Sequence, residues 1–243
     1  MMPNLSGKTA LVTGASRGIG RALALALARA GAHVLALART VGGLEELDDE
    51  IRAANGKASL IPLDLTDSAA IAALGPSLAA RFPRLDILVA NAGDLGELAP
   101  LTDIDEKVWA RVLDVNLNAN LRLLRTLDPL LRAGSARVVF MSSNVGGAEP
   151  RAFWGAYAVS KAGLEMLAKT YALEAKSAGV RVAVIDPGPM RTRMRAAAMP
   201  GEKPETLPEP AELAPLLFHA VSSAYDGMAE RLVFREWRTR ELA

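Results

Sequence analysis

The stretch TGASRGIG, residues 13–20, decides the fold class of this chain. It lies between a short apolar run, Thr9–Thr13, and a helical pattern that covers Ile19–Ala30. Glycines at these positions allow a tight turn and let the backbone approach a pyrophosphate, whose charge is attracted by the N-terminus of the following helix. A glycine-rich turn can also occur without a ligand. Its position directly after the first strand is what favours a nucleotide site here.

Strands and helices are predicted to alternate along the rest of the chain. The strand candidates are Thr9–Thr13, Val34–Leu37, Ser59–Leu63, Ile87–Ala90, Val138–Met141, Val180–Ile185 and Leu232–Phe234. The helical patterns cover Ile19–Ala30, Val41–Ala54, Ser68–Arg81, Asp105–Arg132, Tyr157–Ala178 and Pro210–Ser222. Short, continuously apolar strands separated by helices are typical of a parallel sheet that is covered on both faces. The pattern predicts an α/β fold, a doubly wound parallel sheet of about seven strands with helices on both faces, in a single domain spanning residues 1–243.

Composition excludes several classes of function. The 243 residues carry 28 basic and 27 acidic side chains, and a net charge of +1 argues against a nucleic-acid partner. There is no cysteine, and only two histidines, His33 and His219, so no metal site is expected. No apolar run is long enough to span a membrane, and Met1–Lys8 lacks the apolar core of a secretory signal. We therefore expect a cytoplasmic protein.

One segment departs from the regular alternation. Between Pro187 and Pro210 the chain is rich in proline, methionine and arginine and shows no clear helical or strand pattern. A loop of this length inside a compact domain is usually functional. We predict that residues of about 188–210 form a lid over a substrate site.

The end of the second predicted strand indicates which nucleotide is bound. A site for NAD usually has an acidic residue there, which holds the ribose 2′-hydroxyl. This chain reads Leu37-Ala38-Arg39-Thr40 instead. Arg39 and Arg17 could both contact a 2′-phosphate through charge-assisted hydrogen bonds, which favours NADP(H). The alternative is that both arginines are ordinary solvated surface charges.

Two further groups of residues suggest acid–base chemistry. Tyr157 and Lys161 are four residues apart and so share one face of a helix. A lysine ammonium near a tyrosine favours the phenolate and lowers its pKa from about 10. Ser142-Ser143-Asn144 follows a predicted strand, which places a hydroxyl at the carboxyl edge of the sheet, where ligands of such folds bind.

Taken together, these motifs resemble the short-chain dehydrogenase/reductase family over nearly the whole chain. The sequence TGASRGIG is similar to the family's TGxxxGxG, and Tyr157–Lys161 to its YxxxK. The other matches are Asp64-Leu65 to the adenine-contacting pair, Ala90–Gly93 to NNAG, Asn116 to the tetrad asparagine, and Pro187-Gly188 with Thr192 to the segment that meets the nicotinamide. The resemblance implies a Rossmann-type fold and a homodimer or homotetramer.

The resemblance also implies a reaction, the transfer of a hydride between NADP(H) and a small or medium carbonyl or alcohol substrate. Tyr157 would be the general acid or base, Ser143 would hydrogen bond the substrate oxygen, Lys161 would hold the ribose and lower the tyrosine pKa, and Asn116 would position a water. The cofactor-binding residues implied are Gly14, Ser16, Arg17, Gly18, Ile19, Gly20, Arg39, Asp64, Leu65, Asn91, Ala92, Gly93, Tyr157, Lys161, Pro187, Gly188, Met190 and Thr192.

The chain departs from the family pattern at three places. Ala90 replaces the first asparagine of NNAG, and the glycine pair usual after the last strand is absent. The interval from Ser143 to Tyr157 is slightly longer than usual, which places an insertion within residues 147–155. Ser142 or Asn144 could therefore compete for the role of Ser143, although Ser143 keeps the family's S-x-x-G register.

Two alternatives stay open from the sequence. Phe153 and Trp154 could line a pocket for an apolar substrate, or pack against a neighbouring helix or subunit. The whole protein could also be a non-catalytic NADP(H)-binding sensor or scaffold with the same fold. An epimerase or dehydratase of the extended type would need a larger substrate domain than this chain can provide.

Overall fold

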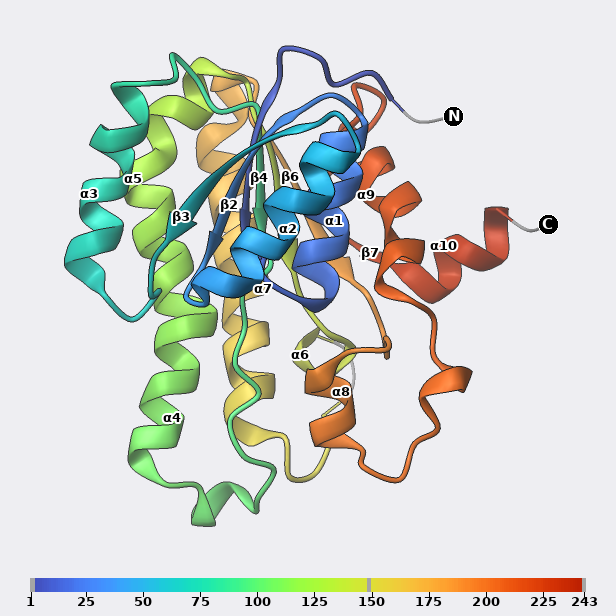
Figure 1. The fold of residues 1–243 in the computed structure, drawn as a ribbon. Coiled ribbons are helices and arrows are strands. Elements are labelled where there is room, and N and C mark those ends of the chain that lie inside the picture. Colours follow the sequence, from blue (N-terminus) through green and yellow to red (C-terminus); the bar gives the residue numbers. More distant parts are fainter. Residues whose placement is uncertain (1–2, 148–149, 242–243) are drawn as a thin grey trace.

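The computed structural model of the chain describes residues 3–147 and 150–241. Seven parallel strands form one sheet, and Figure 1 shows helices packed on both of its faces. The strands are β1 (Thr9–Thr13), β2 (His33–Ala38), β3 (Lys57–Pro62), β4 (Ile87–Ala90), β5 (Arg137–Met141), β6 (Arg181–Asp186) and β7 (Met228–Val233). Their order in the sheet is β3-β2-β1-β4-β5-β6-β7, which confirms the predicted Rossmann-type, doubly wound, single-domain fold.

The helices connect these strands. They are α1 (Gly18–Arg29), α2 (Val41–Ala53), α3 (Ser68–Ala79), α4 (Glu106–Leu113), α5 (Ala119–Ala133), α6 (Asn144–Gly147), α7 (Gly155–Ala175), α8 (Arg193–Ala198), α9 (Ala214–Val221) and α10 (Phe234–Glu241). Of these, α1, α2, α3, α5, α7 and α9 bury apolar faces against the sheet. Short 3-10 turns occupy Leu101–Asp103, Lys176–Ala178, Pro204–Thr206 and Pro210–Leu213. Among the described helices, none is both long and apolar enough to cross a membrane.

Two hydrophobic cores lie on opposite faces of the sheet. One joins the strands to α1, α2 and α9 through residues such as Leu23, Leu44 and Leu216. The other joins them to α3, α5 and α7 through residues such as Leu127 and Leu164. This explains why the inner strands β1, β2, β4, β5 and β6 are almost continuously apolar, because they are covered on both sides, whereas the edge strands β3 and β7 are only partly buried.

The sequence predicted the strands better than the helices. The predicted helix Asp105–Arg132 is wrong as a single α-helix, since a π-helical segment, Asp114–Asn118, separates α4 from α5. The prediction for Leu232–Phe234 is also displaced, because β7 ends at Val233 and Phe234 already begins α10. The predicted insertion within 147–155 falls partly on residues 148–149, which lie outside the described residues.

Sheet topology locates the ligand crevice. The order reverses between β1 and β4, so the connections from these two adjacent strands leave in opposite directions. A crevice opens outside the carboxyl ends of the strands at such a point. The Thr13 hydroxyl accepts hydrogen bonds from the backbone N–H groups of Asn91 and Ala92, both at 3.0 Å, and so ties the ends of β1 and β4 together.

Close packing of α3 on α5 generates a test of this architecture. A Cβ on Gly75 would lie 2.1 Å from the backbone oxygen of Thr126, so Gly75→Ala must separate the two helices. We expect it to lower the free energy of unfolding by about 1–3 kcal/mol. Gly42→Ala in α2 is the matched control. Its Cβ would meet nothing within 4 Å, so it should be neutral or stabilising by up to ~1 kcal/mol. Urea unfolding of both variants measures the difference, and equal effects would contradict the packing described.

Candidate active site

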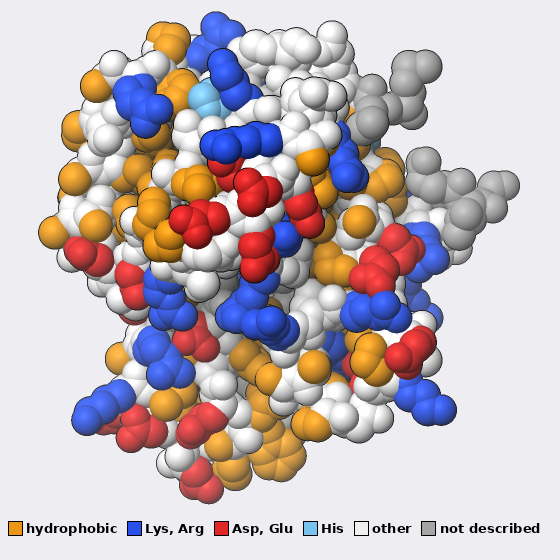
Figure 2. Space-filling view, in the orientation of Figure 1, with side chains coloured by type: hydrophobic (Ala, Val, Ile, Leu, Met, Phe, Trp, Pro, Cys, Tyr) orange, Lys and Arg blue, Asp and Glu red, His pale blue; other side chains and the backbone are white. Residues whose placement is uncertain are grey.

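A cavity of about 640 Å³ opens at the carboxyl ends of the strands. Figure 2 shows Lys and Arg side chains gathered near the middle of this face, beside a hollow in the surface. Most of the predicted site residues line the cavity: Gly14, Ser16, Arg17, Gly18, Ile19, Arg39, Asp64, Leu65, Asn91, Ala92, Gly93, Tyr157, Lys161, Pro187 and Thr192. Segments that are distant in the sequence therefore meet at one place.

Five predicted site residues lie around the cavity rather than on its lining: Gly20, Asn116, Ser143, Gly188 and Met190. Asn116 is completely buried, and Met190 packs in the core on the side of α1 and α9. Gly188 has a φ of +64°, a conformation that glycine adopts without strain. These residues can shape the site from behind.

The turn between β1 and α1 is built for close backbone approach. A Cβ on Gly20 would lie 2.2 Å from the carbonyl oxygen of Gly14, so only glycine fits there. Gly14 and Gly18 have φ values of +67° and +55°. Arg17, the residue before α1, provides no side-chain cap, and the first turn of α1 contains no acidic residue. The free N–H groups of this helix end therefore suit an anion such as a phosphate.

The segment predicted to form a lid lies beside this turn. Thr192 lies beside Gly18, with its Cγ2 atom 3.4 Å from where a Cβ of that glycine would be. Thr192 also caps α8 by accepting a hydrogen bond from the Arg195 backbone N–H at 3.2 Å. Arg195 in turn forms two hydrogen bonds with the Glu202 carboxylate, at 2.5 and 2.6 Å. The segment is thus an ordered part of the cavity wall.

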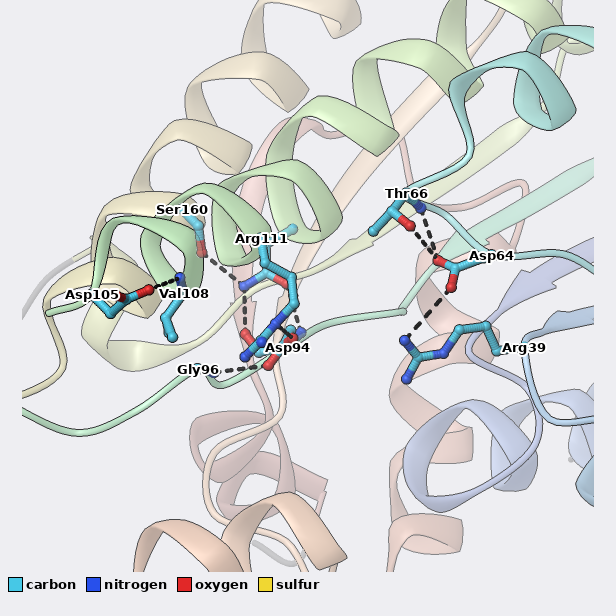
Figure 3. A network of polar contacts seen from close by, with 10 residues as sticks. Arg39, Asp64, Thr66, Asp94, Gly96, Asp105, Val108, Arg111 and Ser160 are labelled. Carbon is cyan, nitrogen blue, oxygen red and sulfur yellow. Dashed lines mark hydrogen bonds and ion pairs between the residues drawn. The ribbon is translucent and has the colours of Figure 1, made fainter.

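Two arginines and an aspartate lie at the far end of the cavity. Arg17 and Arg39 are both exposed, and an Nη1 atom of Arg39 is 3.7 Å from the Asp64 carboxylate (Figure 3). Asp64 accepts hydrogen bonds from the backbone N–H and the hydroxyl of Thr66, both at 2.9 Å. The backbone bond from Thr66 is the main reason that the pKa of Asp64 is lowered, and Arg39 adds to it. This part of the cavity therefore combines two exposed cations with a carboxylate that is held by hydrogen bonds.

Tyr157 and Lys161 lie in the first turns of α7 and line the same cavity. Burial raises the pKa of the Tyr157 phenol to about 12, while a hydrogen bond with the Ser143 side chain acts in the opposite direction. Burial also lowers the pKa of Lys161 to about 8, and the negative charge of Glu165 opposes that shift. Both groups are therefore neutral more easily than they would be in water.

The sequence predicted that the Lys161 ammonium group lowers the pKa of Tyr157, and the structure differs from this prediction. The Lys161 Nζ atom donates a hydrogen bond to the carbonyl oxygen of Met141 at 2.7 Å, and it lies 5.6 Å from the centre of the Tyr157 ring. The predicted lowering of the tyrosine pKa is therefore wrong for this structure. The physical reason is that burial raises the pKa of the phenol, and the effect that opposes this shift comes from the Ser143 side chain and not from Lys161.

The serines after β5 have different partners. Ser142 is buried, and its hydroxyl donates to the Glu165 carboxylate at 2.5 Å. The Ser143 side chain instead hydrogen bonds with Tyr157 and lies 3.5 Å from the Asn144 amide oxygen. Of the three candidates in this stretch, Ser143 is the one that lowers the pKa of the phenol, whereas Ser142 is the one that lines the cavity.

Asn116 connects the π-helical segment to the cavity wall. Its side chain accepts from the Asp94 N–H at 2.7 Å and donates to the Asp94 carbonyl and the Ser160 hydroxyl, both at 2.9 Å (Figure 3). Ser160 donates on to the backbone oxygen of Tyr157 at 2.7 Å. Asn120 donates to the Asn116 carbonyl at 2.8 Å. The roles of Asp94, Ser160 and Asn120 were missed by sequence reasoning, although Ser160 lies within the Tyr157–Lys161 motif.

The two aromatic residues before Tyr157 behave differently. Trp154 packs edge-on against the Tyr157 ring with their centres 5.9 Å apart. Phe153 is 58% exposed and has a φ of +71°, which is unusual for a bulky residue. Trp154 is therefore a packing partner of the phenol, and Phe153 presents an apolar ring at the surface beside it.

Comparison with known proteins gives consistent matches over most of the chain. The family model described as short chain dehydrogenase matches residues 8–203. The uncharacterized oxidoreductase YciK of Escherichia coli K12 is 39% identical over 216 residues, covering 87% of this chain and 85% of that protein.

Solved structures agree with this result. A short chain dehydrogenase of Escherichia coli CFT073 complexed with NADPH superposes with a TM-score of 0.92 at 36% identity, covering 97% of this chain and 99% of the other. A second, from Shigella flexneri 2a strain 301 and complexed with NADP, has a TM-score of 0.89 at 35% identity, covering 97% and 100%.

The buried lysine makes stability depend on pH in a predictable way. The unfolded chain keeps a proton on Lys161 up to about pH 10.5, whereas the folded protein releases it near pH 8. Between these values the unfolded state binds more protons, so the free energy of unfolding gains up to about 1.4 kcal/mol per pH unit from this group as the pH rises. In Lys161→Met this contribution should be absent.

Urea unfolding of wild type and Lys161→Met between pH 7.5 and about 10 tests this expectation. The free energy of unfolding of wild type should increase relative to that of Lys161→Met as the pH rises through this window. Lys169→Met removes an exposed lysine from the same helix and should keep the slope of wild type. Parallel curves for wild type and Lys161→Met would contradict the described burial of the ammonium group.

Proposed function

This chain belongs to the short-chain dehydrogenase family, and from that premise we propose that it is an NADP(H)-dependent oxidoreductase. It transfers a hydride between NADP(H) and a small or medium carbonyl or alcohol substrate, with Tyr157 as the general acid or base. One observation carries the proposal: the same cavity is lined by the glycine-rich turn before α1 and by Tyr157 and Lys161. A nucleotide held by the turn would reach the acid–base pair.

The residues present fit a dinucleotide. Gly14 and Gly20 leave no room for a Cβ, and the uncapped N-terminus of α1 opens toward the cavity, as a pyrophosphate requires. The adenine end would contact Asp64 and Leu65, and the segment Pro187–Thr192 with Asn91–Gly93 would enclose the nicotinamide end. When bound, NADP(H) supplies or accepts the hydride at the substrate carbon.

A preference for the phosphorylated cofactor is proposed from the far end of the cavity. Arg17 and Arg39 both line it, and no acidic residue follows β2 to hold a free 2′-hydroxyl. Two similar structures, from Escherichia coli CFT073 and Shigella flexneri, are described as complexes with NADPH and NADP. Asp64 already pairs weakly with Arg39 and would hold this guanidinium near its working position.

The acid–base step is assigned to Tyr157. Because burial raises its pKa to about 12, the phenol keeps its proton near neutral pH and can donate it to a carbonyl oxygen. Ser143, which hydrogen bonds with this phenol, would orient the same oxygen. Lys161 would hold the ribose, and Asn116 would keep the Asp94 loop in place and position a water for proton return.

Two further features belong to the proposal. The segment of about residues 188–210 would act as the substrate lid, since Thr192 reaches across to Gly18 and Arg193, Met194 and Ala197 of α8 line the cavity. The protein would be a homodimer or homotetramer, since Leu121 of α5 and Val159, Met166 and Leu173 of α7 expose apolar side chains. Exposed apolar side chains that lie together are typical of surfaces that contact another protein chain.

Tyr157→Phe tests the assignment of the acid. Because the phenol oxygen is the proton donor, this variant should lose about 10²–10⁴-fold in kcat for NADPH-dependent carbonyl reduction, while NADPH binding measured by nucleotide fluorescence stays unchanged. Tyr171→Phe is the matched control, since Tyr171 lies on the same helix and its hydroxyl donates to Asp128 at 2.8 Å, away from the cavity. Retained turnover in Tyr157→Phe would overturn the assignment. Binding without any turnover in wild type would favour the sensor or scaffold.

Arg39→Ala tests the cofactor preference. A hydrogen bond to a charged group contributes about 1.5–3 kcal/mol, so the Kd for NADPH should rise roughly tenfold or more while the Kd for NADH changes little. Arg29→Ala removes an exposed arginine from the other end of α1 and serves as the control. Equal weakening of NADPH and NADH binding, measured by fluorescence titration, would show that Arg39 does not bind the 2′-phosphate.

A further inference from the structure

A buried charged cluster lies behind the candidate active site, at the carboxyl ends of β5, β6 and β7. We call Ser142, Glu165, Asp186 and Arg231 the Arg231 cluster. They come from four different elements or their ends: Ser142 follows β5, Glu165 lies on α7, Asp186 ends β6 and Arg231 lies on β7. The Asp186 and Glu165 side chains are only 3% and 10% exposed, and that of Arg231 is 18% exposed. None of these roles followed from the sequence motifs.

Arg231 makes the central contacts of the cluster. Its Nη2 atom donates to the backbone carbonyl of Ser143 and to the Glu165 carboxylate, both at 2.5 Å. Its Nε atom donates to the same Glu165 oxygen at 3.1 Å. Its Nη1 atom lies 3.9 Å from the Asp186 carboxylate. One guanidinium therefore joins the backbone of the serine to two buried carboxylates.

The carboxylates fix the residues on either side of Ser143. Glu165 accepts the Ser142 hydroxyl at 2.5 Å. Asp186 accepts the backbone N–H of Gly188 at 3.0 Å and a backbone hydrogen bond from Asn144. Ser142, Ser143 and Asn144 are thus each held by a different member of the cluster, and Gly188 of the lid segment is held by the same aspartate.

The backbone after Ser143 passes directly over the ion pair. A Cβ on Gly147 would lie 2.4 Å from the Arg231 Nη2 atom and 2.8 Å from a Glu165 oxygen. A side chain at position 147 would therefore have to displace the Arg231 guanidinium or the Glu165 carboxylate. A planar guanidinium can satisfy a carbonyl and a carboxylate at once, which an ammonium group cannot do with the same geometry.

Burying two carboxylates around one cation carries a large desolvation penalty, so it stabilises a fold inefficiently. Apolar side chains of similar volume often stabilise a core equally well or better. The charged cluster instead fixes orientation, because each hydrogen bond holds one backbone or side-chain group after β5 in place. Misplacing a catalytic group by about 1 Å can lower a rate by roughly 10²-fold.

We propose that Arg231 is a positioning residue: through its hydrogen bond to the Ser143 carbonyl, balanced by Glu165 and Asp186, it fixes the Ser143 hydroxyl against Tyr157. Arg231 makes no hydrogen bond to the phenol, and its direct contact with the serine segment is the Ser143 carbonyl. This inference rests on the proposed function for its effect on turnover, and on the fold alone for its effect on the order of the serine segment.

The experiment compares Arg231→Met and Arg231→Lys with wild type. The control is Arg238→Met, which breaks the exposed ion pair between Arg238 and Glu212, whose side-chain nitrogen and oxygen are 3.2 Å apart. With a carbonyl substrate that wild type reduces, Arg231→Met should lower kcat on the order of tenfold or more and leave KM for NADPH nearly unchanged. Arg231→Lys keeps the charge and should recover part of kcat. Arg238→Met should match wild type.

A second readout does not depend on activity. Amide hydrogen exchange of a peptide covering residues 142–147 should be faster in Arg231→Met by on the order of tenfold, whereas residues 9–20 keep the exchange rates of wild type. If Arg231→Met alone does not fold, because Glu165 and Asp186 are left without a cation, Arg231→Met/Glu165→Met removes one of the two charges and is used in its place.

The outcomes separate the two proposals. Unchanged kcat together with unchanged exchange in 142–147 would overturn the role of Arg231, as would an equal loss in Arg231→Met and Arg238→Met. Absence of any NADPH-dependent reduction in wild type would overturn the proposed function. The exchange measurement would then still decide whether Arg231 orders the segment that carries Ser143.

Discussion

The contact between the backbone of Gly14 and α1 at Gly20 is the constraint on which the rest of the structure depends. Because no side chain fits between them, α1 can start directly at the end of β1 and point its N-terminus into the crevice. The Asn91 amide group donates to the Thr13 carbonyl at 3.0 Å and closes the same junction from β4. The position of the cavity, between two strands whose connections diverge, follows from this close packing.

Helix α7 carries the chemistry on a single buried face. Tyr157, Ser160, Lys161 and Glu165 recur at helical spacing, and all four are less than 9% exposed. Each one contacts a different partner in or behind the site: Ser143, Asn116, the Met141 carbonyl and Arg231 respectively. The opposite face of the same helix exposes Val159, Met166 and Leu173. One helix therefore serves the cavity on one side and offers an apolar surface on the other.

Burial is the dominant electrostatic effect in this site. It raises the pKa of Tyr157 and lowers that of Lys161, so it opposes the charged form of both groups. Burial also raises the pKa of Asp186, although a backbone N–H and Arg231 oppose the shift. In this site, burial therefore favours the neutral form of the Tyr157 phenol.

The sequence by itself determined the alternation of strands and helices, the glycine-rich turn and the motifs that meet at the cavity. These features depend on local periodicity and on residues such as Gly14, for which few substitutes exist. The π-helical segment at Asn116, the direction of the Lys161 ammonium group and the assembly of the Arg231 cluster were decided only by the tertiary structure. Arg231 and Ser143 are 88 positions apart in the sequence. No local sequence pattern predicts that these two residues pair, because their contact depends on which strand ends become neighbours in the sheet.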